Sequence, residues 1–245
     1  NDSYRLSDYR YLRTFSETVC QPGDQPFESG RYFKTTIIWD WNGTLLNDID
    51  LCVNTMNKLL NARNLPPINQ TVYRGVFSFP VKDYYQTIGF DFSKEDFEIP
   101  AHQYIDLYYE GFDGCSLQNE TEKVLDYFRQ KNVRQFVLSA MEHGMLEKTL
   151  KAKGIFEYFE GVAGLTDHLA VSKVDQGKML IGKFKIEPVE TWMIGDTVHD
   201  FEVASEMGVK CVLIADGHQS EKRLLKTEAP VLQNIGQLLS SNFPF

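Results

Sequence analysis

The stretch Thr35-Thr-Ile-Ile-Trp-Asp-Trp-Asn-Gly-Thr44 decides the fold of this chain. It begins as a short run of β-branched and apolar residues and ends abruptly in polar residues and a glycine. Such a run is typical of a strand buried inside a parallel sheet, and the polar residues after it would form the loop at the strand's carboxyl end. Open parallel sheets bind their ligands at that end. The stretch therefore predicts both a sheet and the position of a site.

Four further segments share this pattern of a short apolar run. The expected strands are residues 134–139, 160–163, 191–195 and 209–214. Helical segments lie between them: we expect one helix to open with a capping box of Asn119 and Glu122, and two others to end at Gly154 and Gly208. Strands that alternate with helices predict an α/β fold, a Rossmann-like parallel sheet with helices on both faces.

The interval 51–117 breaks this alternation. It carries helical patterns at residues 53–60 and 104–108 and few strand signals. We therefore expect a helical cap domain inserted after the first strand, with residues 35–50 and 118–245 forming the α/β core. The insert is rich in aromatic residues, which we expect to form its own core, with substrate contact as the alternative. These are Tyr73, Phe77, Phe79, Tyr84, Tyr85, Phe90 and Phe92.

Residues 1–34 form an N-terminal extension in this division of the chain. Their basic and acidic residues balance, which argues against a basic targeting peptide. Aromatic and leucine residues between Tyr4 and Phe15 fit either a short helix packed on the core or a flexible arm, and the sequence leaves both open.

Composition excludes several classes of function. The chain has 245 residues, 42% of them hydrophobic, and a formal net charge of -9, which argues against a broad basic surface for nucleic acid or for an anionic membrane. Its four cysteines lack metal-binding spacing, so a reducing compartment is expected. No apolar run approaches the ~20 residues that span a bilayer. We expect a cytoplasmic protein without nucleic-acid or membrane partners; its oligomeric state is not indicated.

Four polar elements lie at or near the expected carboxyl ends of the strands. In chain order they are the loop 40–44, Ser139, a lysine at position 173 or 178, and the segment Gly195-Asp-Thr-Val-His-Asp200. This order resembles the haloacid dehalogenase (HAD) superfamily, from about Thr35 to Ala215, and the insert resembles the cap of its phosphoglycolate phosphatase-like branch. The resemblance implies a HAD-like core and a Mg²⁺-dependent phosphatase that hydrolyses a small phosphate ester through an aspartyl phosphate.

The first element would supply the nucleophile. Asp40 is a carboxylate at a strand end, able to attack phosphorus in line. Asn42 would point to the same side of the strand, since alternate residues share a side. Gly43 permits a tight turn, and the resemblance implies that Gly43 and Thr44 contact the phosphate. On its own, the motif could be a simple turn.

The second and third elements would bind the phosphoryl group. Ser139 can donate its hydroxyl to a phosphoryl oxygen, assisted by the backbone N–H of Ala140. Lys173 can neutralise the charge on the phosphoryl group and the nucleophile. Lys178 lies one helical turn further and is the alternative. A lone serine after a strand usually caps a helix, and a lone loop lysine is usually solvated, so the partners of these residues decide the interpretation.

The fourth element offers two carboxylates, Asp196 and Asp200, and hard oxygen ligands suit Mg²⁺. By resemblance, Asp40, Asp196 and the backbone carbonyl of Asn42 bind the ion, and Asp200 supports the site or contributes indirectly. The alternative is that both aspartates cap and stabilise the following helix. No histidine shows ligand spacing, so we assign none a role; this applies to His143, His168, His199 and His218.

Asn42 departs from the family pattern, which has an aspartate there as general acid and base. An amide cannot carry that proton, so the sequence predicts a preference for good leaving groups, such as acyl, aryl or pyrophosphoryl esters. It also predicts that Asn42→Asp restores the acid and favours alkyl phosphates. The alternatives are a phosphate-binding protein with weak turnover and, less favoured, a dehalogenase, which needs no metal.

Overall fold

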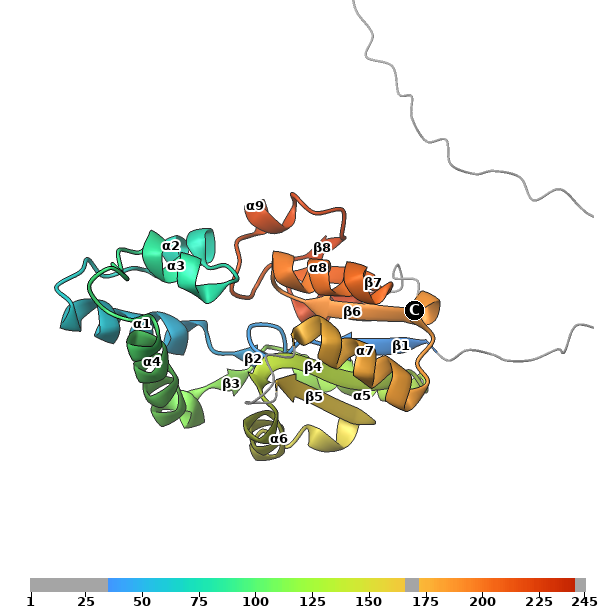
Figure 1. Ribbon diagram of the computed structural model, residues 1–245. Helices are drawn as coiled ribbons and strands as arrows, with labels where there is room; N and C mark the ends of the chain where they lie inside the picture. The colour runs from blue at the N-terminus through green and yellow to red at the C-terminus, as the bar shows by residue number, and fades with distance from the viewer. Residues whose placement is uncertain (1–34, 166–171, 241–245) are drawn as a thin grey trace, which may run out of the picture. The chain divides into compact units, whose positions relative to one another are not determined.

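The computed structural model describes residues 35–165 and 172–240, and a six-stranded parallel sheet lies at their centre (Figure 1). Its strands are β1 (Thr36–Trp39), β4 (Arg134–Glu142), β5 (Gly161–Leu165), β6 (Thr191–Gly195), β7 (Lys210–Ile214) and β8 (Val231–Leu232). Their order across the sheet is β5-β4-β1-β6-β7-β8, and every neighbouring pair is parallel. All four residues of β1 are buried between β4 and β6, as their apolar sequence predicts.

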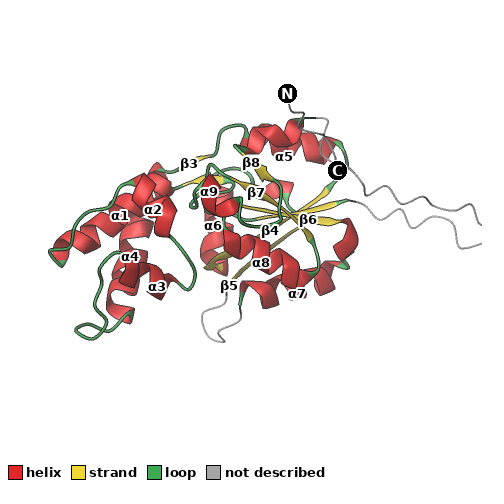
Figure 2. Ribbon diagram, turned by 90° about the horizontal axis from the view of Figure 1, so that it is seen from above, coloured by secondary structure: helices red, strands yellow, loops and turns green. Residues whose placement is uncertain are grey.

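Helices cover both faces of this sheet. They are α5 (Thr121–Gln130), α6 (His143–Ala152), α7 (Lys173–Phe184), α8 (Val198–Met207) and the short α9 (Glu221–Leu224). Successive residues of β1 point to opposite faces: Ile37 and Trp39 pack in the core cluster that includes α5 and α6, whereas Ile38 packs in the cluster that includes α7 and α8. Figure 2 shows α5 on one side of the sheet and α7 and α8 on the other. The predicted α/β fold is confirmed.

The predicted capping box of Asn119 and Glu122 is wrong. Helix α5 begins at Thr121, and its N-cap residue is Glu120, which makes no side-chain cap hydrogen bond. Glu120 has a φ of 67°, in the left-handed region, so the chain turns sharply at that residue and Asn119 lies outside the capping position. Val124, Leu125 and Phe128 of this helix are buried.

Strand β4 is longer than its sequence indicates. It continues past Ser139 to Glu142, with an irregular register against β5 after Leu138. The extended chain delivers Glu142 to the start of α6, where its carboxylate accepts hydrogen bonds from the N–H groups of Gly144 and Met145. Ser139 is therefore held inside a strand, close to its carboxyl end.

Residues 51–117, called the insert below, are mainly helical, as predicted. The helices are α1 (Ile49–Ala62), α2 (Gln70–Val76), α3 (Val81–Thr87) and α4 (Glu98–Gly111). The helix α1 begins two residues before the insert. The segment that leads into the insert, β2 (Leu46–Asn47), pairs antiparallel with its last residues, β3 (Ser116–Leu117). Short 3₁₀ turns occupy Phe112–Gly114, Phe156–Tyr158, Pro188–Glu190 and Ile235–Leu239.

Aromatic residues form much of the insert's core, as expected. Tyr73, Tyr84, Tyr85 and Phe90 are buried, and the rings of Tyr73 and Tyr84 meet edge to face with centroids 5.8 Å apart. The expectation of a helix or arm within residues 1–34 lies outside the described residues. Within the described ranges, no helix combines the length and apolar character needed to cross a bilayer.

Candidate active site

Lys173 joins two aspartates from different parts of the chain. Its Nζ lies 2.5 Å from Oδ1 of Asp40, after β1, and 2.6 Å from Oδ1 of Asp200, in the first turn of α8. Lys173 is the first residue of α7, whose start is fixed by a capping box of Ser172 and Asp175. The start of α7 therefore positions the Lys173 ammonium at the carboxyl ends of the strands.

The carboxyl group of Asp40 is almost completely buried, with 6% of the residue exposed. Burial raises the pKa of Asp40 because it removes water from the charged form; Lys173 opposes this rise, and the carboxylates of Asp200 and Asp196 add to it. Ionised Asp40 thus depends on nearby positive charge, and Lys173 supplies one such charge in direct contact.

Asp196 follows β6 and is fully buried beside Asp40. Its Oδ1 accepts a hydrogen bond of 2.9 Å from the Thr44 hydroxyl, and its Oδ2 accepts one of 2.5 Å from the backbone N–H of His218. The Thr44 hydroxyl also lies 3.4 Å from Oδ2 of Asp40. The Thr44 hydroxyl therefore lies between the carboxylates of Asp40 and Asp196. Each oxygen of Asp196 accepts one hydrogen bond, from the Thr44 hydroxyl or from the His218 N–H.

Asp200 has both carboxylate oxygens occupied. Oδ1 receives the Lys173 ammonium, and Oδ2 accepts from the backbone N–H of Asp196 and from both the N–H and the hydroxyl of Thr197. Thr197, not Asp196, is the N-cap residue of α8, and Asp200 completes its capping box. These contacts suit a residue that orients the loop and Lys173 better than one that binds a ligand directly.

The carboxylates of Asp40, Asp196 and Asp200 could hold a divalent metal ion. One oxygen from each lies within 4.8 Å of the others, and all three residues are buried. Three buried carboxylates against one contacting ammonium leave excess negative charge, which a dication would balance. Because both oxygens of Asp200 are engaged, Asp40 and Asp196 are the side chains best placed to hold the ion, with Asp200 behind them.

Gly43 sits where only glycine fits. Its φ is +77°, in the left-handed region, and a Cβ there would overlap the Asp196 carboxylate and the His218 ring. Its N–H donates to the carbonyl of Leu46 and to Oδ1 of Asp48. The backbone of Gly43 therefore lets the Asp196 carboxylate and the His218 ring approach the loop closely.

Ser139 and Ala140 lie beside Asp40 in the same cavity. Ser139 is 1% exposed, and its Oγ accepts a hydrogen bond of 3.1 Å from the N–H of Met141, which fixes the hydroxyl oxygen. Lys178, the alternative to Lys173, is exposed on α7. The structure thus gathers Asp40, Asn42, Ser139, Ala140, Lys173, Asp196 and Asp200 around one cavity.

The side chain of Asn42 is turned toward the insert. Its Nδ2 donates to Oδ2 of Asp48 at 2.9 Å and to the hydroxyl of Tyr108, on α4, at 2.8 Å. A primary amide has two N–H donors, so both are used. The Tyr108 hydroxyl donates in turn to Oδ2 of Asp48 at 2.8 Å. The Asn42 side chain therefore links the loop 40–44 to the insert through its hydrogen bond to Tyr108.

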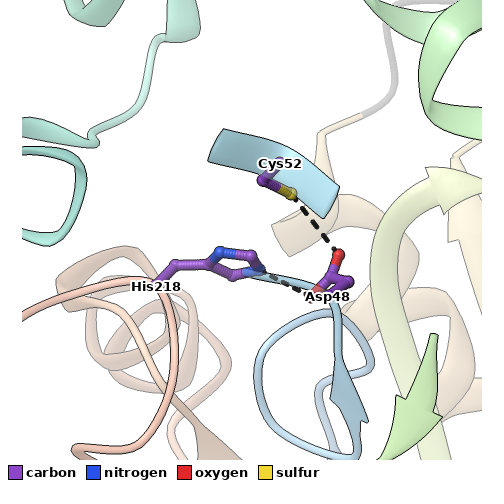
Figure 3. Close-up of side chains that lie close together, drawn as sticks. All are labelled: Asp48, Cys52 and His218. Atoms are coloured by element: carbon purple, nitrogen blue, oxygen red, sulfur yellow. Dashed lines mark hydrogen bonds and ion pairs between the residues drawn. The ribbon is translucent and has the colours of Figure 1, made fainter. Parts of the chain in front are cut away.

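Asp48 and His218 form a buried ion pair with Nε2 and Oδ1 3.2 Å apart (Figure 3). Figure 3 also shows Cys52 approaching the same carboxylate, at 3.6 Å. Burial lowers the pKa of His218, but the Asp48 carboxylate, together with the charges of Asp196 and Asp40, raises it to about 9. The other ring nitrogen, Nδ1, lies 2.9 Å from the hydroxyl of Tyr73. Since Asp48 is already saturated with donors, this cluster is a hydrogen-bonded network in its own right.

Sequence reasoning missed Asp48, His218 and Tyr108. One signal was present for His218, which lies in the loop after the strand at 209–214, at the sheet edge where ligands bind. Nothing in the local sequence distinguishes Asp48 from an ordinary loop aspartate or Tyr108 from a core tyrosine. Their importance comes from contacts across 60 and more positions of the chain.

A cavity of about 790 Å³ extends from Asp40 into the insert. Aromatic residues form much of its wall, and several of the insert aromatics belong both to the insert's core and to the cavity wall. Those of the expected set that line it are Tyr73, Phe77, Phe79, Tyr84 and Tyr85, while Phe90 and Phe92 do not. Gly43 and Thr44 are not among the residues that line the cavity; the Gly43 N–H donates to the Asp48 carboxylate, and the Thr44 hydroxyl donates to the Asp196 carboxylate.

Comparison with known proteins agrees with this architecture. Tyrosine-protein kinase PtkA of Mycobacterium tuberculosis is 24% identical over 218 residues, which cover 89% of this chain and 72% of the relative. The putative pyrophosphatase PpaX of Clostridium perfringens is 21% identical over 178 residues, 71% of this chain and 80% of the relative.

Solved structures share the fold. A haloacid dehalogenase-like hydrolase from Streptococcus pneumoniae superposes with a TM-score of 0.70 at 21% identity, covering 81% of this chain and 92% of that one. The family model described as haloacid dehalogenase-like hydrolase matches residues 37–214, more than half of the chain. This chain belongs to the haloacid dehalogenase-like hydrolase family.

Proposed function

We propose that this protein is a Mg²⁺-dependent phosphatase that hydrolyses a small phosphate monoester with Asp40 as nucleophile. One observation carries the proposal: Lys173 contacts Asp40 and Asp200 at 2.5 and 2.6 Å, with Asp196 and Ser139 beside them in the same cavity. A carboxylate, a cation and a hydroxyl donor around one cavity are groups that phosphoryl transfer requires, and this supports the proposal.

In the first step, a carboxylate oxygen of Asp40 attacks phosphorus, and the bond from phosphorus to the leaving oxygen breaks. Lys173 favours the ionised form of Asp40 and would face the charge on the phosphoryl group. The Ser139 hydroxyl, whose oxygen is fixed by the N–H of Met141, donates to a phosphoryl oxygen. In the second step, water attacks phosphorus, the bond from phosphorus to the Asp40 oxygen breaks, and a proton of the water passes to solvent. Inorganic phosphate leaves and the Asp40 carboxylate is regenerated.

Asp40 and Asp196 would hold the Mg²⁺ ion, with the backbone carbonyl of Asn42. When bound, the ion would neutralise part of the charge that the phosphoryl oxygens bring into the site. Asp200 keeps Lys173 and the Asp196 loop in place through its four hydrogen bonds.

The proposal is tested by turnover of p-nitrophenyl phosphate with and without Mg²⁺. We expect turnover that is lost in excess chelator and restored by Mg²⁺, and lost in Asp40→Asn. Asp50→Asn is the matched control, because Asp50 is an exposed aspartate on α1 that does not line the cavity.

Turnover by Asp40→Asn, or turnover that persists in chelator, contradicts the mechanism. Phosphate binding without turnover would instead indicate a phosphate-binding protein. Release of halide from a haloacid in the presence of chelator would indicate a dehalogenase.

A further inference from the structure

We propose that the substrate of this site is the phosphate monoester of a phenol, with its aromatic ring held in the cavity between Asp40 and the insert. The inference rests on the proposed phosphatase function and adds the class of the leaving group. Two independent features support it: the chemistry of the cavity wall and the occupied amide of Asn42.

Part of the cavity wall consists of aromatic rings that pack against one another. Phe77 contacts Phe79 and Tyr84 edge to face, with ring centroids 5.4 Å apart in each pair. Aromatic rings favour such edge-to-face and offset contacts with a further ring. Phe79 is 39% exposed and Ile105, on α4, is 47% exposed, although both line the cavity. This leaves apolar surface that a substrate ring would cover.

The charges in the cavity disfavour an anionic leaving group. Among the described residues that line it, Lys173 is paired with Asp40 and Asp200, His218 with Asp48, and His199 with Glu202. Glu142, whose carboxylate accepts hydrogen bonds from the N–H groups of Gly144 and Met145, also lines the cavity. A carboxylate or a second phosphate on the leaving group would thus find no unpaired cation among the described lining residues, and burying it would carry a large desolvation cost.

Asn42 leads to the same class of leaving group by a different route. Both of its amide hydrogens are donated to Asp48 and Tyr108, so it offers none to the leaving oxygen. When the bond from phosphorus to oxygen breaks, its electron pair stays on that oxygen. A phenolate can hold this charge, because the pKa of a phenol such as the tyrosine side chain is about 10. An alkoxide needs a proton during bond cleavage.

Phosphonates test the wall without the chemistry of the leaving group, because their carbon–phosphorus bond is not cleaved. We would measure inhibition constants for phenylphosphonate, cyclohexylphosphonate, methylphosphonate and phosphonoacetate against p-nitrophenyl phosphate, using the full chain with Mg²⁺. We expect phenylphosphonate to bind about ten-fold tighter than methylphosphonate and tighter than cyclohexylphosphonate, and phosphonoacetate to bind weakest.

Two variants test whether the preference for phenylphosphonate comes from the apolar cavity wall. Phe79→Ala and Ile105→Ala should each weaken phenylphosphonate by about 3- to 10-fold while inhibition by inorganic phosphate stays within two-fold. Ile99→Ala is the matched control, because Ile99 lies on the same helix α4 and is 49% exposed but does not line the cavity. It should change neither constant.

Substrate turnover completes the test. Phenyl phosphate should exceed cyclohexyl phosphate in kcat/KM, and Phe79→Ala should reduce this ratio through KM. Equal affinity for phenyl- and methylphosphonate, tighter binding of phosphonoacetate, or wall variants that behave like Ile99→Ala would overturn the inference while leaving the phosphatase intact. A wild-type protein that hydrolyses no phosphate monoester would instead refute the proposed function, and this inference with it.

Discussion

The amide nitrogen of Asn42 and the carboxylate of Asp48 are joined by a hydrogen bond of 2.9 Å. The sequence alone suggested that position 42 was a vacant acid site that an aspartate would fill. In the structure, the Asn42 side-chain amide at this position donates a hydrogen bond to the buried Asp48 carboxylate. This contact changes the expected outcome of substitutions on both sides of it.

Asn42→Asp should not restore an acid. It would place two carboxylates in hydrogen-bond distance of one another, and the Tyr108 hydroxyl could satisfy only one of them. We expect the free energy of unfolding to fall by about 1–3 kcal/mol, measured by denaturant titration, with no gain in alkyl phosphate turnover. The double variant Asn42→Asp/Asp48→Asn returns one donor to the pair and should be less destabilised than the sum of the single variants. A selective rise in alkyl turnover in Asn42→Asp would contradict this account.

Removing the Asp48 carboxylate should leave His218 as a buried cation without its partner. We expect Asp48→Asn to lower the free energy of unfolding by about 3 kcal/mol, because breaking one side of a buried ion pair leaves an uncompensated charge. Asp50→Asn, two residues away on the exposed side of α1, is the control and should stay within about 0.5 kcal/mol of wild type. Equal effects of the two substitutions would mean that the pair contributes nothing.

Lys173 and Lys178 offer a matched pair on one helix. Lys173→Ala should reduce kcat/KM about 10²–10³-fold, the usual effect of deleting a group that stabilises transition-state charge. Lys178→Ala should change it little, since that side chain is exposed. If Lys173→Ala folds poorly because Asp40 and Asp200 lose their shared cation, Lys173→Arg keeps the charge but not the position and should still lose turnover. A larger loss in Lys178→Ala would show that the lysine is misassigned.

Tyr84→Phe should not destabilise the unliganded protein. The buried hydroxyl of Tyr84 lacks a partner among the residues described, so deleting it removes an uncompensated polar group. We expect the free energy of unfolding to stay equal or to rise by about 1 kcal/mol, measured by thermal and denaturant unfolding. A loss of more than about 1 kcal/mol would indicate that this hydroxyl is paired in solution.

The sheet and the chemistry-bearing elements were predictable from the chain because their signals are local. A β-branched run such as Thr36–Trp39 specifies a buried strand, and Asp40, Ser139 and Asp196 each stand at or near the end of such a run. Parallel strands bring their carboxyl ends to one edge, so the order of these elements along the chain already implies that they meet. The start of α7 at Lys173 was equally local, since Ser172 and Asp175 cap it.

Local sequence patterns predicted the structure less well where one pattern is compatible with several structures. The pair Asn119 and Glu122 has the spacing of a capping box, yet the left-handed turn at Glu120 starts the helix elsewhere. The aromatic periodicity of the insert could not separate core from cavity wall, because Tyr73 and Tyr84 belong to both.

The network around Asn42 was decided only by tertiary structure. Tyr108 reaches Asp48 across 60 positions and His218 reaches Tyr73 across 145, and no short-range pattern encodes such contacts. The sequence determined that residue 42 cannot act as a general acid, because a side-chain amide does not release a proton near neutral pH. The fold decided where the two amide hydrogens go, because the packing of the insert against the sheet edge places the Asp48 carboxylate and the Tyr108 hydroxyl within hydrogen-bond distance of them.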